Sequence, residues 1–259
     1  MRKLLILIGL CLTVALSGQG NSILPGVVAA SGQVTAVAST LPNNLISAWK
    51  FEEASTPFVD SKAVANLAVG GTTSFQAVGK DGYAVGIDAN GEYMANSANK
   101  CDEEFSSSSA IGISFWMYIT SLPSVHGHKE QILNAVMNDG YLNVWLESDR
   151  LYFNSPNTVP AAQSVYSTVI TTINDWIQVV VNITAGGDMK VYFNGVDETG
   201  APRTFTGTIS TGNAAGAFYV SSSSANEHFM GRLDEMYIYP RILTAQEIID
   251  LQTKFYPFL

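Results

Sequence analysis

The chain has 259 residues, of which 47% are hydrophobic and 14% are charged, and its formal net charge at pH 7 is −9. Proteins bind phosphate backbones through clustered lysine and arginine, so this acidic balance, without a basic stripe, excludes a nucleic-acid partner. The length is sufficient for one large all-β domain or two small ones.

The N-terminus carries the charged residues Arg2 and Lys3, followed by an apolar run from Leu4 to Leu12 and smaller residues to Ser17. This layout is typical of a secretory signal peptide. The run is shorter than the roughly 20 apolar residues that a membrane-spanning helix needs. We therefore predict a signal peptide over residues 1–17, with a rival cleavage site after Ala30, and a secreted or cell-surface protein without a membrane span after cleavage.

Residues 18–43 contain no charged side chain and consist largely of small residues, so they cannot build a core of their own. The composition predicts a flexible arm or linker. The alternative is that residues 32–39 form a strand, which pairs with the edge of the domain or with a neighbouring subunit. The second interpretation predicts a homo-oligomer or a surface array joined through residues 18–43.

From residue 44 onward, short alternating runs of β-branched and aromatic residues are separated by clusters of Gly, Asn, Asp and Ser, as in a β-sandwich. Asn90-Gly91, Gly186-Gly187 and Asn194-Gly195 are turn sequences that tolerate positive φ. The clearest predicted strands are Leu45 to Phe51, Ile111 to Ile119, Tyr141 to Leu146, Leu151 to Asn154, Trp176 to Ile183, Met189 to Phe193, Phe218 to Ser221 and Arg232 to Tyr239.

One helix is predicted near the C-terminus. Thr244 and Glu247 have the spacing of a capping box, in which each side chain binds a free backbone amide at the start of a helix. Ile248, Ile249 and Leu251 follow as an apolar stripe. The helix is short, so we expect it to close the sandwich instead of forming a layer.

Five segments follow one another in a characteristic order: Leu45 to Glu53 with Asp60-Ser61, Gly82 to Tyr93, Ile113 to Tyr118, Asp175 to Val196, and Gly231 to Ile248. Through these segments the chain resembles the laminin-G-like, concanavalin A-like jelly-roll family. The last segment is the most specific. The resemblance implies one domain over residues 44–259, an all-β two-sheet antiparallel β-sandwich with one short C-terminal helix.

The resemblance also implies a function class and a metal. Many relatives bind carbohydrate, so we expect a non-catalytic binding or adhesion module for a glycan or a cell-surface or extracellular protein. Related domains often hold one structural calcium ion, a hard cation that prefers oxygen ligands. By resemblance the candidate ligands are Asp88 and Asn90 in the signature turn, or Glu52 and Asp60 with Asp234.

Two alternatives to a binding module follow from the same residues. The uncharged arm favours a structural subunit of an extracellular or virion-surface assembly. A glycoside hydrolase needs two carboxylates flanking the scissile bond, and the nearest match is Glu147 with Asp149. The expected third carboxylate is missing and the pair falls between two strands, so we interpret it as a hairpin turn. Asp234 and Glu235 are adjacent, so we expect them on opposite faces of a strand.

The remaining candidates are histidines and aromatic residues. His126, His128 and His228 could supply three imidazoles to zinc, but we expect a solvated loop because nothing else supports a metal there. The four tryptophans lie within predicted strands, where aromatic residues usually belong to the core. Tyr141, Tyr152 and Tyr166 flank hairpins, so we predict these three tyrosines as ligand-binding residues.

Overall fold

The structure is a computed structural model that describes residues 44–96, 109–137, 140–154, 164–201, 203–205, 218–222 and 227–257. The predicted signal peptide and the arm of residues 18–43 lie outside the described residues, so both stay predictions. Within the described part, strands form two antiparallel sheets, which confirms the predicted β-sandwich. None of the helices in these ranges is long and apolar enough to cross a membrane.

The first sheet has nine strands: β1 (Ser47–Trp49), β3 (Ser74–Val78), β4 (Tyr83–Ile87), β6 (Ala110–Ile119), β11 (Trp176–Thr184), β12 (Asp188–Phe193), β13 (Val196–Asp197), β14 (Arg203–Thr204) and β16 (Gly231–Tyr239). Seven of them follow the order β13-β12-β11-β6-β16-β4-β3, while β1 pairs with β16 and β14 pairs with β12. The long central pair, β6 with β11, has a continuous register from one end to the other.

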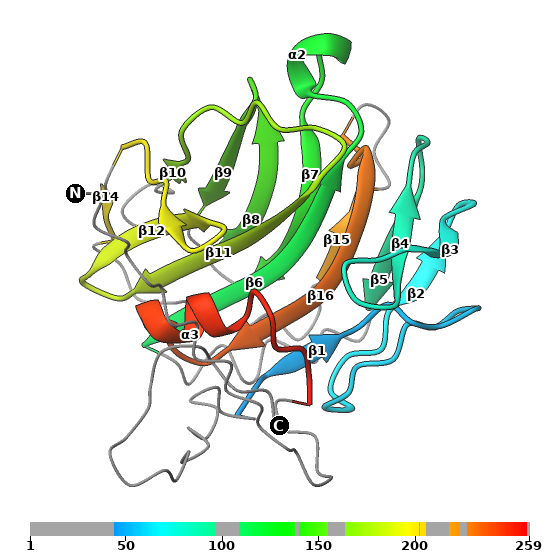
Figure 1. Ribbon diagram of the computed structural model, residues 1–259, viewed down its shortest axis with the longest axis horizontal. Coiled ribbons are helices and arrows are strands. Elements are labelled where there is room, and N and C mark those ends of the chain that lie inside the picture. Colours follow the sequence, from blue (N-terminus) through cyan, green and yellow to red (C-terminus); the bar gives the residue numbers. More distant parts are fainter. Residues whose placement is uncertain are drawn as a thin grey trace, which may run out of the picture. The chain divides into compact units, whose positions relative to one another are not determined.

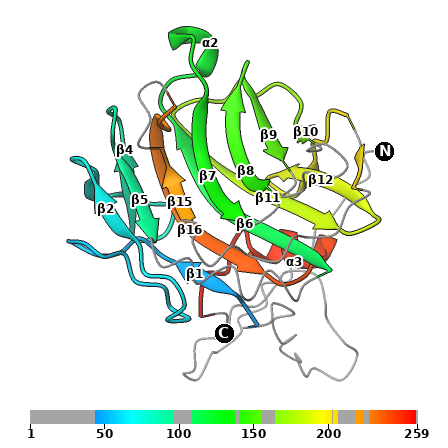
Figure 2. The ribbon, with the colours of Figure 1, turned by 180° about the vertical axis from the view of Figure 1, so that it is seen from behind.

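The second sheet has seven strands: β2 (Ala68–Gly70), β5 (Tyr93–Asn96), β7 (Glu130–Met137), β8 (Gly140–Glu147), β9 (Arg150–Asn154), β10 (Ser164–Tyr166) and β15 (Phe218–Ser221). Their order is β10-β9-β8-β7-β15-β5-β2. Figure 1 shows β7, β8 and β9 side by side, and Figure 2 shows the same group from behind. All eight strands predicted from the sequence are present, and the structure adds β2, β3, β4, β5, β7, β10, β13 and β14.

The main core fills the space between the two sheets. Inward-facing side chains from both contribute, and many of them have no exposed surface, among them Phe115, Val144, Phe153, Val181 and Leu233. Along β8 and β9 the buried residues alternate with half-buried ones, because successive side chains of a strand point to opposite faces. The inward set of each strand therefore fixes which residues face outward.

The predicted C-terminal helix is α3 (Ala245–Asp250), and it covers part of the outer face of the nine-stranded sheet (Figure 1). The capping box is confirmed: the Thr244 side chain accepts a bond from the Glu247 amide, and the Glu247 carboxylate accepts one from the Thr244 amide. Arg241 adds two hydrogen bonds to the same carboxylate, of 2.6 and 2.9 Å. A second apolar cluster lies under this helix: Leu45, Ala48, Val180, Tyr237, Tyr239, Leu243, Ile248 and Leu251.

A second, unpredicted helix is the single turn α2 (Pro123–His126) between β6 and β7. Pro123 occupies its first turn, where a missing amide costs nothing, and Gly127 ends it with a φ of 73°. The turn is too short for a periodic pattern in the sequence to reveal it. It places His126 shortly before β7, which begins at Glu130.

Candidate functional site

Three aromatic side chains form a row across the seven-stranded sheet. Trp145 on β8 is paired with Tyr152 on β9, and Tyr152 is paired with Tyr166 on β10. The ring centroids are 5.3 Å apart for Trp145 and Tyr152, which are stacked, and 5.5 Å apart for Tyr152 and Tyr166. All three are half-buried, while their neighbours Val144, Leu146, Leu151 and Phe153 face the core. The aromatic row, Trp145–Tyr152–Tyr166, therefore lies on the outer face of the sheet.

Cations lie against both ends of the aromatic row. The Lys129 ammonium is 5.0 Å from the ring centroid of Trp145, and the Arg150 guanidinium is 5.4 Å from that of Tyr166. The indole N–H of Trp145 donates to the carboxylate of Glu147 at 3.0 Å. Cation–π contacts and this hydrogen bond hold the rings in fixed orientations.

A row of amides runs beside the aromatic row on the same face. Asn134 on β7 is paired with Asn143 on β8, and Asn143 is paired with Asn154 on β9. Ser164 continues this amide row on β10 and donates to the side-chain oxygen of Asn154 at 3.1 Å, while Tyr219 on β15 continues it at the other end. The side-chain oxygens of Asn134 and Asn143 are buried and have no hydrogen-bond partner among the described residues.

The two rows together make a surface that is apolar along one line and polar along the next. Rings offer apolar area to C–H groups, while amides and phenol hydroxyls donate and accept hydrogen bonds at fixed spacing. Among the described residues, no second apolar cluster packs on this face as one does under α3.

Of the three tyrosines predicted to bind a ligand, the structure brings Tyr152 and Tyr166 together in the aromatic row. Tyr141 lies on β8, and its side chain is outside the described residues. The expectation of four core tryptophans holds for Trp49 and Trp116 and is wrong for Trp145 and Trp176, which are half-buried. The expectation rested only on the position of each tryptophan within a predicted strand. Because Trp145 alternates with Val144 and Leu146, which face the core, its side chain faces outward.

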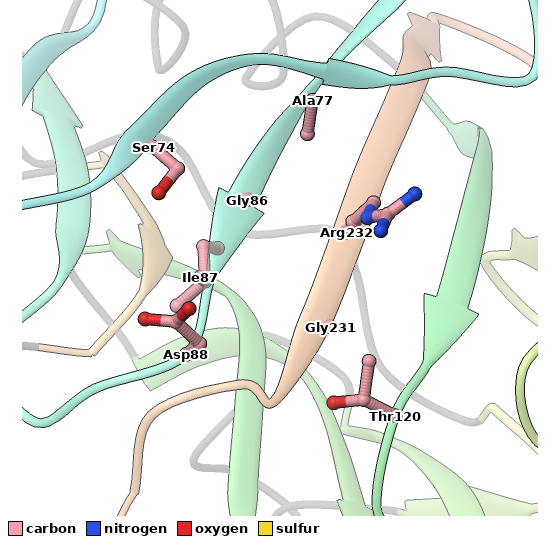
Figure 3. Close-up of a pocket in the computed structure, with 8 residues that line it drawn as sticks. All are labelled: Ser74, Ala77, Gly86, Ile87, Asp88, Thr120, Gly231 and Arg232. Atoms are coloured by element: carbon pink, nitrogen blue, oxygen red, sulfur yellow. The ribbon is translucent and has the colours of Figure 1, made fainter.

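A separate hollow of about 210 Å³ lies on the nine-stranded sheet (Figure 3). Its lining comes from β3, β4, β16 and the residues that follow β4 and β6: Ser74, Ala77, Gly86, Ile87, Asp88, Thr120, Gly231 and Arg232. Arg232 is held over the Tyr118 ring at 4.9 Å and donates to the carbonyl oxygen of Val78 at 3.2 Å. Both rows of the first surface belong to the other sheet, so the two surfaces are distinct.

Of the residues predicted to bind calcium, Glu52 and Asp234 lie at one turn, while Asp88 and Asn90 lie in another. Asp60 accepts from four backbone amides, those of Ala48, Lys62, Val64 and Ala65. Glu52 accepts from the Tyr83 amide, and Asp234 accepts from the amides of Lys80 and Asp81, so both bind the turn between β3 and β4.

Asp88 and Asn90 lie in the turn between β4 and β5, where Glu92 accepts from the amides of Asp88 and Ala89. In the described ranges no three His, Cys, Asp or Glu side chains form a group that could hold a metal ion. Calcium binding by either of the two predicted sets stays a prediction.

The carboxylates considered for hydrolysis occupy a hairpin turn. Glu147 ends β8, and Ser148 and Asp149 connect it to β9 with φ angles of 49° and 57°. Asp149 accepts from the Ser124 amide at 2.9 Å. The interpretation of this pair as a turn is confirmed.

Asp234 and Glu235 differ from the expectation of a regular strand. The register of β16 against β6 shifts between Asp234 and Tyr237, and Glu235 has a φ of 50°, so the simple alternation of faces fails here. Neither side chain has exposed surface. Burial raises the pKa of Asp234 to about 7, and burial with the neighbouring Asp234 charge raises the pKa of Glu235 to about 9.

The expectation of solvated histidines is wrong. His126, His128 and His228 lie together, with ring centroids 3.7 Å apart for His126 and His128 and 5.2 Å apart for His128 and His228. The fold brings them together because Gln131, at the start of β7, forms a parallel bridge with His228. No local pattern in the sequence predicts that bridge.

The sequence matches one family model. Residues 88–249 match Laminin_G_3, described as the concanavalin A-like lectin/glucanases superfamily. The chain belongs to this family. No curated protein shows a significant sequence match to it.

Solved structures share the fold at low identity. The botulinum neurotoxin serotype D binding domain is 14% identical with a TM-score of 0.65, over 81% of this chain and 50% of that one. The binding domain of Paraclostridial mosquitocidal protein 1 is 18% identical with a TM-score of 0.66, over 81% and 52%. Domain 4 of an extracellular GH43 arabinanase from Geobacillus stearothermophilus, in complex with arabinotriose, is 20% identical with a TM-score of 0.62, over 81% and 98%. This laminin-G-like chain spans about half the length of the neurotoxin binding domains it matches.

Proposed function

We propose that this laminin-G-like protein is a secreted, non-catalytic module that binds carbohydrate on the outer face of its seven-stranded sheet. The observation that carries the proposal is the pair of adjacent rows, Trp145–Tyr152–Tyr166 and Asn134–Asn143–Asn154. A saccharide has apolar C–H faces and a dense set of hydroxyl groups, so it can use both rows at once.

Three further observations support the proposal. The similar solved structures are binding domains of neurotoxins and of a mosquitocidal protein, or a domain in complex with arabinotriose. The carboxylate pair nearest to a hydrolase pattern, Glu147 and Asp149, belongs to a hairpin turn and the anchoring of Trp145. Secretion is supported by the signal-like N-terminus, which has a charged tip and a short apolar run.

The test is a glycan array followed by calorimetric titration of the best saccharide, with arabinotriose as the first probe. Trp145→Ala should weaken binding roughly tenfold or more, because large aromatic side chains dominate such contact surfaces. The matched control is Trp176→Ala. Trp176 is a half-buried tryptophan of the nine-stranded sheet, where it makes an edge contact with Tyr118 of the same sheet. The control should bind like the wild type.

The proposal fails if Trp145→Ala and wild type bind with the same affinity. It also fails if Trp176→Ala loses binding while Trp145→Ala keeps it, because the binding surface would then lie on the nine-stranded sheet. Circular dichroism of each variant separates lost binding from lost folding.

A further inference from the structure

The histidine cluster, His126, His128 and His228, contains every histidine of the chain. It joins α2, the loop before β7 and the segment before β16. One ring nitrogen of each is buried without a hydrogen-bond partner among the described residues: His126 Nδ1, His128 Nε2 and His228 Nδ1. Among the described side chains no group that could hold a metal ion is found, and imidazole nitrogens bind and release protons between about pH 5 and 8.

Glu130 is the fourth member of this environment and has no exposed surface. One of its carboxyl oxygens is 2.7 Å from His126 Nε2, and the other accepts from the Met230 amide at 3.1 Å. Burial raises the pKa of Glu130 to about 8. The carboxyl therefore holds its proton as the solution is acidified below that pH, and it supplies no negative charge to offset a protonated imidazole.

Burial, followed by the neighbouring imidazoles, lowers the pKa of His126. Burial and His128 likewise lower the pKa of His228. The acidic groups that act on the cluster are Asp149, from the turn after β8, and Asp88 and Glu92, from the segment after β4. The lowered pKa values keep His126 and His228 largely neutral near pH 7, and their protonation in acid places positive charge inside the cluster.

The cluster is connected directly to the aromatic row. Lys129 lies between His128 and Glu130 in the chain, and its ammonium caps the Trp145 ring. The same ammonium is 4.0 Å from the carboxylate of Glu227, the residue before His228. Gln131 is paired with Trp145 on one side, and on the other its amide donates to the Glu227 carbonyl at 2.6 Å. Movement of either histidine segment therefore changes the surroundings of Trp145.

We propose that the histidine cluster is a proton-sensitive switch for the aromatic row: in mild acid, repulsion between the protonated rings displaces Lys129 and Glu227 and weakens saccharide binding at Trp145. The binding part rests on the function proposed above. The structural part, coupling of the histidines to Trp145, does not depend on any ligand.

The ligand-free test follows the tryptophan indole N–H signals and the histidine rings by NMR from about pH 7.5 to about pH 5. The Trp145 signal, assigned from Trp145→Phe, should shift with the same midpoint as the histidine rings, and the Trp176 signal should stay in place. The double variant His128→Gln/His228→Gln should abolish the shift. It retains Glu147, so any shift caused by that carboxylate survives the substitutions.

A second variant keeps the test decisive if the double variant does not fold. Lys129→Gln should leave the histidine titrations intact and stop Trp145 from following them. The proposal is overturned if Trp145 does not respond to pH, or if it responds equally in the variant that folds.

The binding arm compares the affinity of the best array saccharide at the two ends of this pH range. Binding should be roughly fivefold or more weaker in acid for the wild type, and pH-independent for the double variant. Equal affinity at both ends refutes the switch. If no saccharide binds at any pH while Trp145 still follows the histidines, the proposed function fails and the coupling stands.

Discussion

Each sheet has an outer face made of the side chains that point away from the core, but the two outer faces carry different side chains. On the nine-stranded sheet, outward residues such as Ala48, Val180 and Tyr237 are apolar, and α3 covers them. On the seven-stranded sheet, the outward residues are half-buried rings and amides, the aromatic and amide rows. The face of the nine-stranded sheet under α3 contributes buried apolar area to stability, and the face with the two rows is the one proposed to bind saccharide.

This difference can be seen in the burial pattern along single strands. In β11 all seven residues between the two terminal ones are buried, while β9 alternates regularly between half-buried and buried residues. Strands covered on both faces carry continuous apolar runs, and strands covered on one face alternate. β11 is buried on both faces although its run is interrupted by two polar residues, because the amides of Gln178 and Asn182 donate to the carbonyls of Ile248 and Leu243 in the covering segment.

The largest expected effect comes from truncating a buried side chain of α3, the helix that covers part of the outer face of the nine-stranded sheet. Ile248 of α3 is 1% exposed and its neighbour Ile249 is 51% exposed. Ile248→Ala should lower the free energy of unfolding by about 2–4 kcal/mol, because it deletes buried methyl groups and leaves a cavity. Ile249→Ala should change it by less than about 0.5 kcal/mol. Denaturant unfolding of both variants measures the difference, and equal losses would mean that α3 does not cover the sheet.

A smaller effect concerns the carboxylates hidden in the nine-stranded sheet. The pKa of Glu235 is raised to about 9 from an ordinary value of 4.5, so the folded protein holds a proton that the unfolded chain releases between these values. Stability should therefore fall as pH rises through this window, by more than about 1 kcal/mol between neutral and alkaline solution.

Glu235→Gln tests this dependence, because a neutral amide still accepts the hydrogen bond from the Tyr237 hydroxyl. The variant should be more stable than the wild type in alkaline solution and should lose most of the slope toward pH 9. Asp234 and Glu130, whose pKa values burial raises to about 7 and about 8, account for the remaining slope. Thermal melts should be recorded above about pH 6.5, because at lower pH the histidines make stability rise with pH, which opposes the effect of the buried carboxyl groups. An unchanged slope would show that Glu235 is ionised in the folded protein.

Much of the fold could be predicted because its signals are local. Alternating runs identified eight strands, and the spacing of Thr244 and Glu247 identified the start of α3. The Asn194-Gly195 turn has both residues at positive φ, as that sequence favours. The bulge at Glu235 could not be predicted, since glutamate, unlike asparagine or glycine, has no preference for positive φ.

The site was only partly predictable, because its parts come from different strands. Tyr152 and Tyr166 could be proposed from their positions near hairpins, and the outward position of Trp145 could be derived from its neighbours Val144 and Leu146. The register that aligns Asn134 with Asn143 includes a shift between Gln131 and Leu133, which no sequence rule predicts. His228 joins the other histidines only through long-range pairing.

The smallest expected effect tests whether the amide row takes part in binding. The Asn143 side-chain oxygen is buried and has no partner among the described residues, so removing it costs the fold no hydrogen bond through that atom. Asn143→Ala should weaken saccharide binding by about 0.5–1 kcal/mol, the loss of one hydrogen bond, with little change in unfolding free energy. Asn44→Ala, an exposed asparagine before β1, is the control and should match the wild type. If Asn143→Ala instead destabilised the protein and left affinity unchanged, the amide row would be part of the sheet's own packing, and the binding surface would contract to the aromatic row.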